Sequence, residues 1–271
     1  MCGILGFASR RPGDPVVWAA FEAAFRLSEA RGRDASGVAG HAGGAILIHK
    51  RAVPASELLG DEGYRAVRAM GPEVVIAHTR LATKGSPADG ANNHPICAGP
   101  VAGVHNGTLS NDDALLRVLG LRRDGAVDSE AIFRLAEFFC PEGVTAAGLC
   151  KALDLVEGSY AVALVHALQP GELWLARGTR PLSAAWDPKR ETFWFVSEAR
   201  FLTGAYEEAV GSVGMLAIWE VPEGTGLRVR LRPGRGQREL ERFRVPARDL
   251  RAREEAWRAA WHAVRGTAGW W

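Results

Sequence analysis

Apolar and polar positions alternate along the chain in runs that predict its secondary structure. Residues 2–9 are an apolar run that ends in the turn-rich segment 10–15, and this predicts a short buried strand. In residues 16–30 the apolar side chains recur three and four positions apart, which predicts an amphipathic helix. The same criteria predict further strands over 45–50, 74–78, 100–104, 160–166, 172–176, 192–196 and 215–221, and helices over 56–70, 114–119, 129–139 and 145–155.

The order of these elements is strands, then helices, then strands. This order favours an α+β fold with two sheets and helices packed on them. Residues 227–231 are predicted to pair back on 215–221. The Arg-, Pro- and Gly-rich segment 232–236 then marks a boundary between a domain over 1–232 and a C-terminal extension over 233–271.

The extension is rich in Arg and Trp, and residues 248–265 predict a helix with one apolar stripe. Three roles are open for this helix: docking of its apolar stripe on the core of the domain, binding of a partner, or contact of its arginines with nucleic acid. Docking on the core is the favoured role, and the mixture of acidic and basic residues on the helix disfavours the contact with nucleic acid.

Composition narrows the class of protein. The 271 residues carry a net charge of +2, which gives no overall attraction to nucleic acid or to membranes. No apolar stretch approaches 18 residues and no signal peptide is visible, so we expect no membrane span. The four cysteines show neither metal-ligand spacing nor a dense disulfide pattern, as in a reducing, cytoplasmic compartment. No nucleotide-binding Gly-rich loop is found, and we expect no cofactor and no metal.

Cys2 directly follows the initiator methionine. Removal of Met1 would leave a residue with a free thiol and a free α-amine, whose unperturbed pKa values are about 8.5 and about 7.7–8.0. Such an amine can take the thiol proton, so the residue carries its own base. We therefore expect Met1 to be removed, although an arbitrary residue often follows an initiator methionine.

Four clusters of polar residues lie where loops are predicted, and the second and third include segments placed just after strands. They cover residues 31–37, 78–85, 92–95 with 105–107, and 127–130. Singly, each has a structural explanation: Asn106-Gly107 is a turn and Asp128 is placed to cap the next helix. Their combination with Cys2 favours a catalytic site.

Five motifs follow one another in a fixed order. They are Cys2-Gly3-Ile4, Arg31-Gly32-Arg33-Asp34, His78-Thr79-Arg80 with Ala82-Thr83, His105-Asn106-Gly107, and Asp128-Ser129-Glu130. In this order they resemble the glutaminase domain of the class II glutamine amidotransferases, of the glucosamine-6-phosphate synthase type, within the N-terminal nucleophile hydrolase superfamily. The resemblance covers about residues 2–230 and implies a four-layer αββα sandwich.

The resemblance implies a catalytic role for Cys2, Asn106 and Gly107. The Cys2 thiolate attacks the carboxamide of L-glutamine, and a γ-glutamyl thioester forms as ammonia leaves. The side chain of Asn106 and the backbone N–H of Gly107 then stabilise the oxyanion. Arg31 supports the loop around Cys2.

It also implies how the amino-acid head of glutamine is held. Arg80 would bind the α-carboxylate as a bidentate fork, with help from the Thr83 hydroxyl. Asp128 would bind the α-ammonium group, and His94 lies beside the same pocket.

Two positions depart from the family. Leu81 stands where the family has Trp, and Lys84 where it has His, which leaves an ammonia channel open to question. No synthase domain follows, so we expect a glutaminase that supplies ammonia to a synthetase or transferase on another chain. A γ-glutamyl amide or peptide hydrolase and a non-catalytic glutamine-binding module are the alternatives, and a homo-oligomer is left open.

Overall fold

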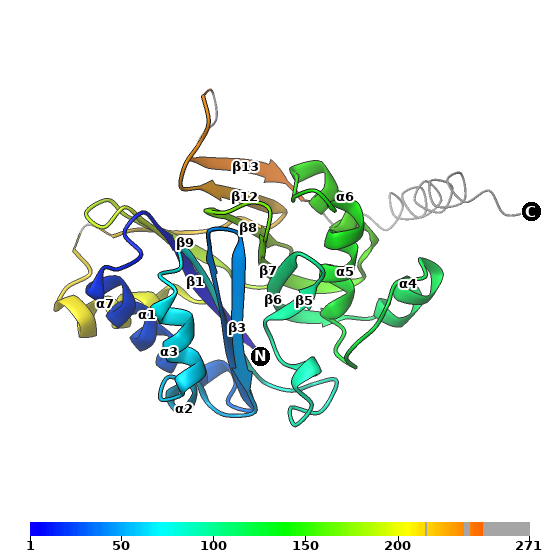
Figure 1. Cartoon of the computed structure of the whole chain (residues 1–271), viewed down its shortest axis with the longest axis horizontal. Coiled ribbons are helices and arrows are strands. Elements are labelled where there is room, and N and C mark those ends of the chain that lie inside the picture. Colours follow the sequence, from blue (N-terminus) through cyan, green and yellow to red (C-terminus); the bar gives the residue numbers. More distant parts are fainter. Residues whose placement is uncertain (215, 236–238, 246–271) are drawn as a thin grey trace, which may run out of the picture.

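A computed structural model describes residues 1–214, 216–235 and 239–245 of the protein. Two antiparallel sheets lie at its centre (Figure 1). The seven-stranded sheet has the order β11-β9-β10-β1-β4-β2-β3, and the six-stranded sheet has the order β13-β12-β8-β7-β6-β5. The strands are β1 (Gly3–Ser9), β2 (Ala35–Ala42), β3 (Ala45–Arg51), β4 (Val74–Arg80), β5 (Ile96–Ala98), β6 (Val101–Leu109), β7 (Gly158–His166), β8 (Glu172–Arg177), β9 (Ser183–Asp187), β10 (Thr192–Val196), β11 (Ala217–Glu220), β12 (Thr225–Arg230) and β13 (Leu240–Arg244).

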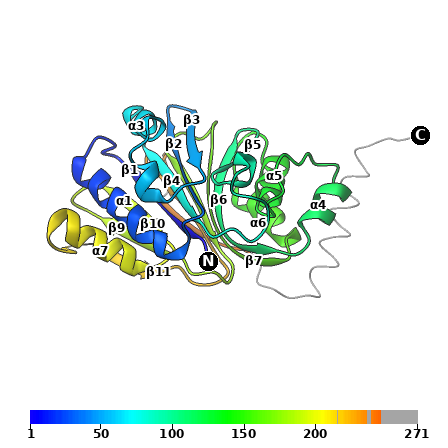
Figure 2. The same cartoon turned by 90° about the horizontal axis from the view of Figure 1, so that it is seen from below.

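Helices cover the outer face of each sheet (Figure 2). The seven-stranded sheet is covered by α1 (Pro15–Leu27), α2 (Ala55–Leu58), α3 (Glu62–Ala69) and α7 (Ala199–Val210). The six-stranded sheet is covered by α5 (Glu130–Phe139) and α6 (Ala146–Leu155), with α4 (Asp112–Val118) packed beside α5. Two short 3₁₀ helices, η1 (Ser28–Arg31) and η2 (Gly90–Asn92), lie in the connections. The fold is therefore the α+β, four-layer αββα sandwich that the sequence predicts.

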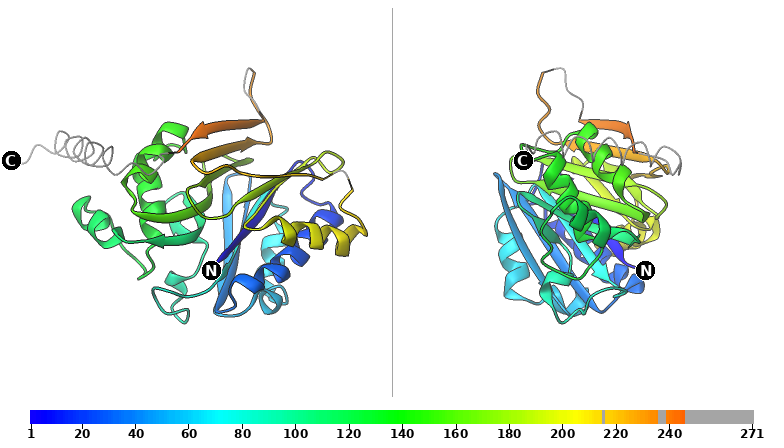
Figure 3. Two further views of the ribbon diagram at one scale, coloured as in Figure 1. Left: turned by 180° about the vertical axis from the view of Figure 1, so that it is seen from behind. Right: turned by 90° about the vertical axis from the view of Figure 1, so that its right-hand side faces the viewer.

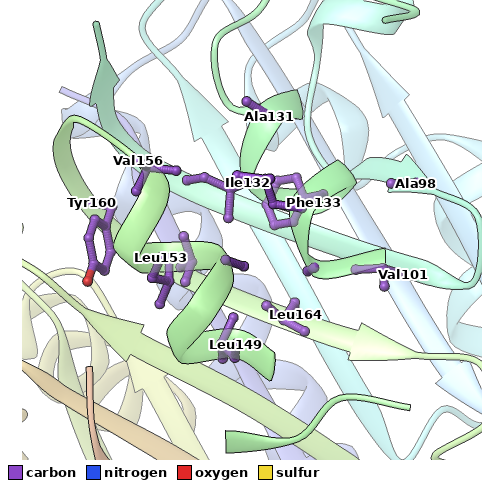
Figure 4. Close-up of a cluster of buried hydrophobic side chains, with 14 of the residues drawn as sticks. Ala98, Val101, Ala131, Ile132, Phe133, Leu149, Leu153, Val156, Tyr160 and Leu164 are labelled. Atoms are coloured by element: carbon purple, nitrogen blue, oxygen red, sulfur yellow. The ribbon is translucent and has the colours of Figure 1, made fainter. Parts of the chain in front are cut away.

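Three hydrophobic clusters fill the three interfaces between the layers. In β1, Ile4 and Ala8 point to the other sheet, whereas Leu5 and Phe7 point to the helices. This alternation follows from the two-residue period of a strand, and it explains why a strand buried on both faces reads as a continuous apolar run. Figure 4 shows the third cluster, in which side chains of α5 and α6, such as Phe133, pack on the six-stranded sheet.

Several predicted elements are confirmed, and others differ from the prediction for local reasons. The strand over 192–196 and the helix over 145–155 are found almost as predicted. The helix predicted over 56–70 is instead two helices, α2 and α3. Asp61 separates them in an extended conformation, and its carboxylate accepts hydrogen bonds from Arg51 at 2.7 and 2.9 Å and contacts His49.

The prediction that residues 227–231 pair with 215–221 is wrong. β12 pairs with β8 and β13 in the six-stranded sheet, whereas β11 pairs with β9 in the other sheet (Figure 3). The chain crosses between the sheets at residues 221–224, where Gly224 N donates to Arg177 O at 2.9 Å. Residues 240–244 of the predicted extension form β13, and the helix predicted over 248–265 lies outside the described residues.

The described part of the chain contains no helix long and apolar enough to cross a membrane. It also contains no group of three or more His, Cys, Asp or Glu side chains that could hold a metal ion.

Candidate active site

The predicted site residues come from strands as well as loops. Residues 78–80 end β4, residues 105–107 lie inside β6, and residues 35–37 begin β2. Their placement in loops was therefore wrong. The physical reason is that sheet hydrogen bonds satisfy the backbone at these positions, so polar side chains can be buried there. β1 and β4 are neighbours in one sheet, and both contact β6 of the other sheet, which brings the segments together.

Cys2 lies just before β1, which pairs with β4 on one side and β10 on the other. Its Sγ donates to Leu81 O at 3.5 Å, and its carbonyl oxygen accepts from Arg31 Nε at 2.6 Å. Burial raises the pKa of the Cys2 thiol above its ordinary value, and the nearby charges of Arg80 and Arg31 offset this only in part. The thiol is therefore protonated at neutral pH and needs a base before it can attack.

Arg31 joins Cys2 to a second residue of the site, Asn106. With the Asn106 amide oriented to satisfy its neighbours, Nδ2 donates to Cys2 O at 3.1 Å and Oδ1 accepts from Arg31 Nη2 at 3.3 Å. Arg31 also forms a partly buried ion pair with Glu198, which precedes α7. Asn106 is 1% exposed, and its amide contacts the backbone of Cys2.

Gly107 follows Asn106 and can only be glycine. Its φ of +155° lies where side chains are rarely tolerated. A Cβ atom at this position would overlap with Ser159 O of β7 and with the ring of His105. The absence of a side chain therefore lets β6 approach β7 closely beside the site.

Arg80 is buried at the end of β4, with 3% of its surface exposed. Its guanidinium donates to Asn93 Oδ1 at 2.8 Å and to the carbonyl oxygens of Lys84 and Gly85 at 2.6 and 2.8 Å. The charges of Cys2, Asp34 and Asp128 all act on Arg80, which places these groups in one electrostatic neighbourhood. Thr83 is exposed in the same loop, and the described contacts include no hydrogen bond from its hydroxyl.

Asp128 does not cap α5 as predicted. The helix begins at Glu130 with Ser129 at the N-cap position, and Asp128 Oδ2 accepts instead from Leu109 N at 2.6 Å. The carboxylate is 3% exposed. It is held at the end of β6 because the strand's last N–H group needs an acceptor there.

His94 lies in the core beside the site. Its ring stacks on His78 with 4.1 Å between centroids, and Phe133 packs against its edge. Burial lowers the pKa of His94 well below its ordinary value and lowers that of His78 to about 3. Both rings are therefore neutral, and the described contacts include no hydrogen bond from His94 to Arg80 or Asp128.

Three residues hold the site in roles that the sequence reasoning did not assign. Asn93 binds Arg80, Glu198 pairs with Arg31, and Lys84 forms ion pairs with Asp112 at 2.6 Å and Asp113 at 3.3 Å on α4. Asn93 and Lys84 lie inside the polar clusters identified in the sequence, and this position was the indication that they belong to the site. Glu198 ends the run 195–198, which resembles a later strand of the family, but its pairing with Arg31, 167 positions away, could not be predicted from the sequence.

Comparison with known proteins identifies relatives of this chain. The chain is 34% identical over 190 residues to the glutamine–fructose-6-phosphate aminotransferase (isomerizing) of Mycobacterium tuberculosis, and 36% identical over 191 residues to that of Aeropyrum pernix. The chain belongs to the class II glutamine amidotransferase family. The matched region is 67% of the chain and 30% of each relative, so the chain spans about a third of the length of these curated relatives. No family model matches the chain.

Solved structures share the fold of this glutamine amidotransferase domain. The glutamine phosphoribosylpyrophosphate amidotransferase of B. subtilis has a TM-score of 0.66 at 20% identity, over 90% of this chain and 49% of that one. A glutamine aminotransferase class-II domain protein from Silicibacter pomeroyi has a TM-score of 0.55 at 16% identity, over 91% of this chain and 100% of that one.

Proposed function

We propose that the chain hydrolyses the carboxamide of L-glutamine through a thioester on Cys2 and supplies the ammonia to a separate partner enzyme. One observation carries this proposal. Three segments far apart in the sequence meet at Cys2: Arg31 and Asn106 bind its carbonyl, and its Sγ faces Leu81 O, beside Arg80. Nucleophilic attack on the side-chain amide of an amino acid requires three kinds of group. They are a thiol, buried amide donors and a buried cation, and all three are present here.

The mechanism begins after Met1 is removed. The α-amine of Cys2 takes the thiol proton, and the thiolate attacks the γ-carbon of glutamine. The C–N bond then breaks as the ammonium of Cys2 returns its proton to the leaving nitrogen, and ammonia departs. Water hydrolyses the thioester to glutamate and restores the thiol.

Asn106 is placed to stabilise the oxyanion of the tetrahedral intermediate. An Asn amide has two N–H donors, and one of them is used by Cys2 O. The other is available to a developing negative charge beside Cys2. The backbone N–H of Gly107 is the proposed second donor.

Arg80 and Asp128 would hold the zwitterionic head of glutamine, with Thr83 and His94 at the edges of this proposed pocket. A guanidinium binds a carboxylate through two parallel hydrogen bonds, and a buried carboxylate suits an ammonium group. Because Arg80 now donates to Lys84 O and Gly85 O, binding of the α-carboxylate must displace at least part of these contacts.

Replacing Arg80 by lysine is expected to raise KM for glutamine by about 10–100-fold, because lysine keeps the charge and loses the fork. Steady-state kinetics of ammonia release measures this. Arg190→Lys is the matched control, since Arg190 pairs with Asp187 near the opposite end of β1. An unchanged KM in Arg80→Lys would remove Arg80 from the substrate pocket.

Activity is expected to depend on a free α-amine at Cys2. The protein can be produced with an N-terminal extension that a site-specific protease removes directly before Cys2. The extended form should release no ammonia from glutamine, and cleavage should restore release, with the new terminus checked by intact mass. Equal activity before and after cleavage would refute the amine as the base.

The partner enzyme is inferred from the relatives. Their names describe the transfer of nitrogen from glutamine to a second compound, and the region that matches this chain is 30% of their length. By analogy with these names, we propose that the ammonia is used by a synthetase or transferase, which the proposal places on another chain.

A further inference from the structure

Arg180 lies on the loop between β8 and β9, which β7 holds close to the site. Gly178 N donates to Tyr160 O at 2.9 Å, and Arg180 N donates to the same oxygen at 3.4 Å. Tyr160 pairs with Gly107 across β6 and β7. The backbone of Arg180 is therefore fixed one strand away from the proposed oxyanion donors.

The side chain of Arg180 reaches from this anchor to the N-terminus. Its Nε donates to Ser159 Oγ at 2.8 Å, and its Nη1 lies 3.5 Å from the Sδ atom of Met1. No carboxylate of the described residues lies within ion-pair distance of Arg180, whereas Arg31 pairs with Glu198 and Arg177 with Glu220. The guanidinium thus presents an unneutralised positive charge beside the residue that precedes the nucleophile.

The side chain of Met1 indicates the separation between the Arg180 guanidinium and the α-nitrogen of Cys2. This side chain spans the distance from the nitrogen of Cys2 to the Arg180 guanidinium, and Met1 is 58% exposed, so the space opens to solvent. Removal of Met1 vacates this space. The leaving nitrogen of the substrate must lie beside the same Cys2 amine to receive its proton, so a group attached to that nitrogen would extend into the vacated space.

We propose that Arg180 forms a subsite for a carboxylate on the leaving group, so that the enzyme accepts γ-glutamyl amides of amino acids as well as glutamine. This inference rests on the proposed carboxamide hydrolysis. The thiolate attacks the γ-carbon, the C–N bond breaks, and the leaving amino acid takes a proton from the Cys2 ammonium. Water then cleaves the thioester to glutamate. Arg180 forms two charge-assisted hydrogen bonds to the leaving carboxylate.

The test compares two amides that differ in this carboxylate, γ-L-glutamylglycine and γ-L-glutamylethylamide, on the full chain with Met1 shown to be absent. The wild-type kcat/KM is expected to favour γ-L-glutamylglycine by about tenfold or more, the size of a charge-assisted contact. Arg180→Gln should lower this ratio at least tenfold, and Arg180→Lys should retain part of it. Arg117→Gln, which changes an exposed arginine on α4, should leave the ratio unchanged.

A ratio near one in the wild type, or a ratio that Arg180→Gln does not change, would overturn the subsite. Calorimetric binding of both amides to Cys2→Ala gives the same comparison without turnover. If glutamine is hydrolysed without a preference between the amides, the subsite is refuted and the proposed function stands. If glutamine is not hydrolysed but Cys2→Ala binds γ-L-glutamylglycine more tightly through Arg180, the function is refuted and the subsite stands.

Discussion

Replacing Cys2 by alanine is expected to reduce the release of ammonia from L-glutamine by about 10⁴-fold or more, the scale of losing a covalent nucleophile. No other described cysteine can substitute, because the thiols of Cys97, Cys140 and Cys150 lie on β5, after α5 and on α6, away from Arg31 and Asn106. The measurement is a coupled assay of ammonia and glutamate on the folded, processed protein.

Cys97→Ala is the matched control, because Cys97 is exposed and its removal should leave turnover unchanged. Labelling by 6-diazo-5-oxo-norleucine gives a second readout: one equivalent should attach to the wild type and none to Cys2→Ala. Native turnover in Cys2→Ala would end the assignment. A Cys2 that is inert to the reagent would favour a glutamine-binding module.

Replacing Asn106 by alanine is expected to lower kcat by about 10²–10³-fold, with a much smaller change in KM, because the proposed role of the amide is to stabilise the oxyanion rather than to bind glutamine. The substitution also removes the Nδ2 contact with Cys2 O and the acceptor of Arg31 Nη2. Kinetics of the variant should therefore be read together with its free energy of unfolding.

Asn111→Ala separates the two effects. Through its amide, Asn111 joins the start of α4 to the connection between α6 and β7, donating to Leu155 O at 2.9 Å and accepting from Glu157 N at 2.8 Å, but it lies after β6 and away from Cys2. Its loss should lower stability while kcat per folded molecule is kept. Equal losses of kcat in both variants would assign Asn106 a structural role.

The layered fold followed from the sequence because buried strands and amphipathic helices have distinct periods. α7 was missed for a tertiary reason. It contains Gly204, which disfavours a helix on propensity alone. In the fold a Cβ at this position would lie 3.2 Å from Leu27 Cδ1 at the end of α1, so the glycine lets the two helices approach closely.

Within the site, the motifs identified the groups but not how they are held. Cys2, Arg80, Asn106 and Asp128 were named from the order of the motifs. The contact of Arg180 with Met1 and the bond from Arg80 to Asn93 depend on how loops pack after the sheets have formed. The partner of β12 was mispredicted because strands that are neighbours in sequence need not share a sheet.

The position of β1 has a consequence for biosynthesis. This strand is flanked by β4 and β10, and β10 ends at Val196. Because β10 comes almost two hundred positions after β1 in the chain, β1 gains its second neighbour late in synthesis. The segment that carries Cys2 is therefore fixed on both sides only after most of the domain has been made.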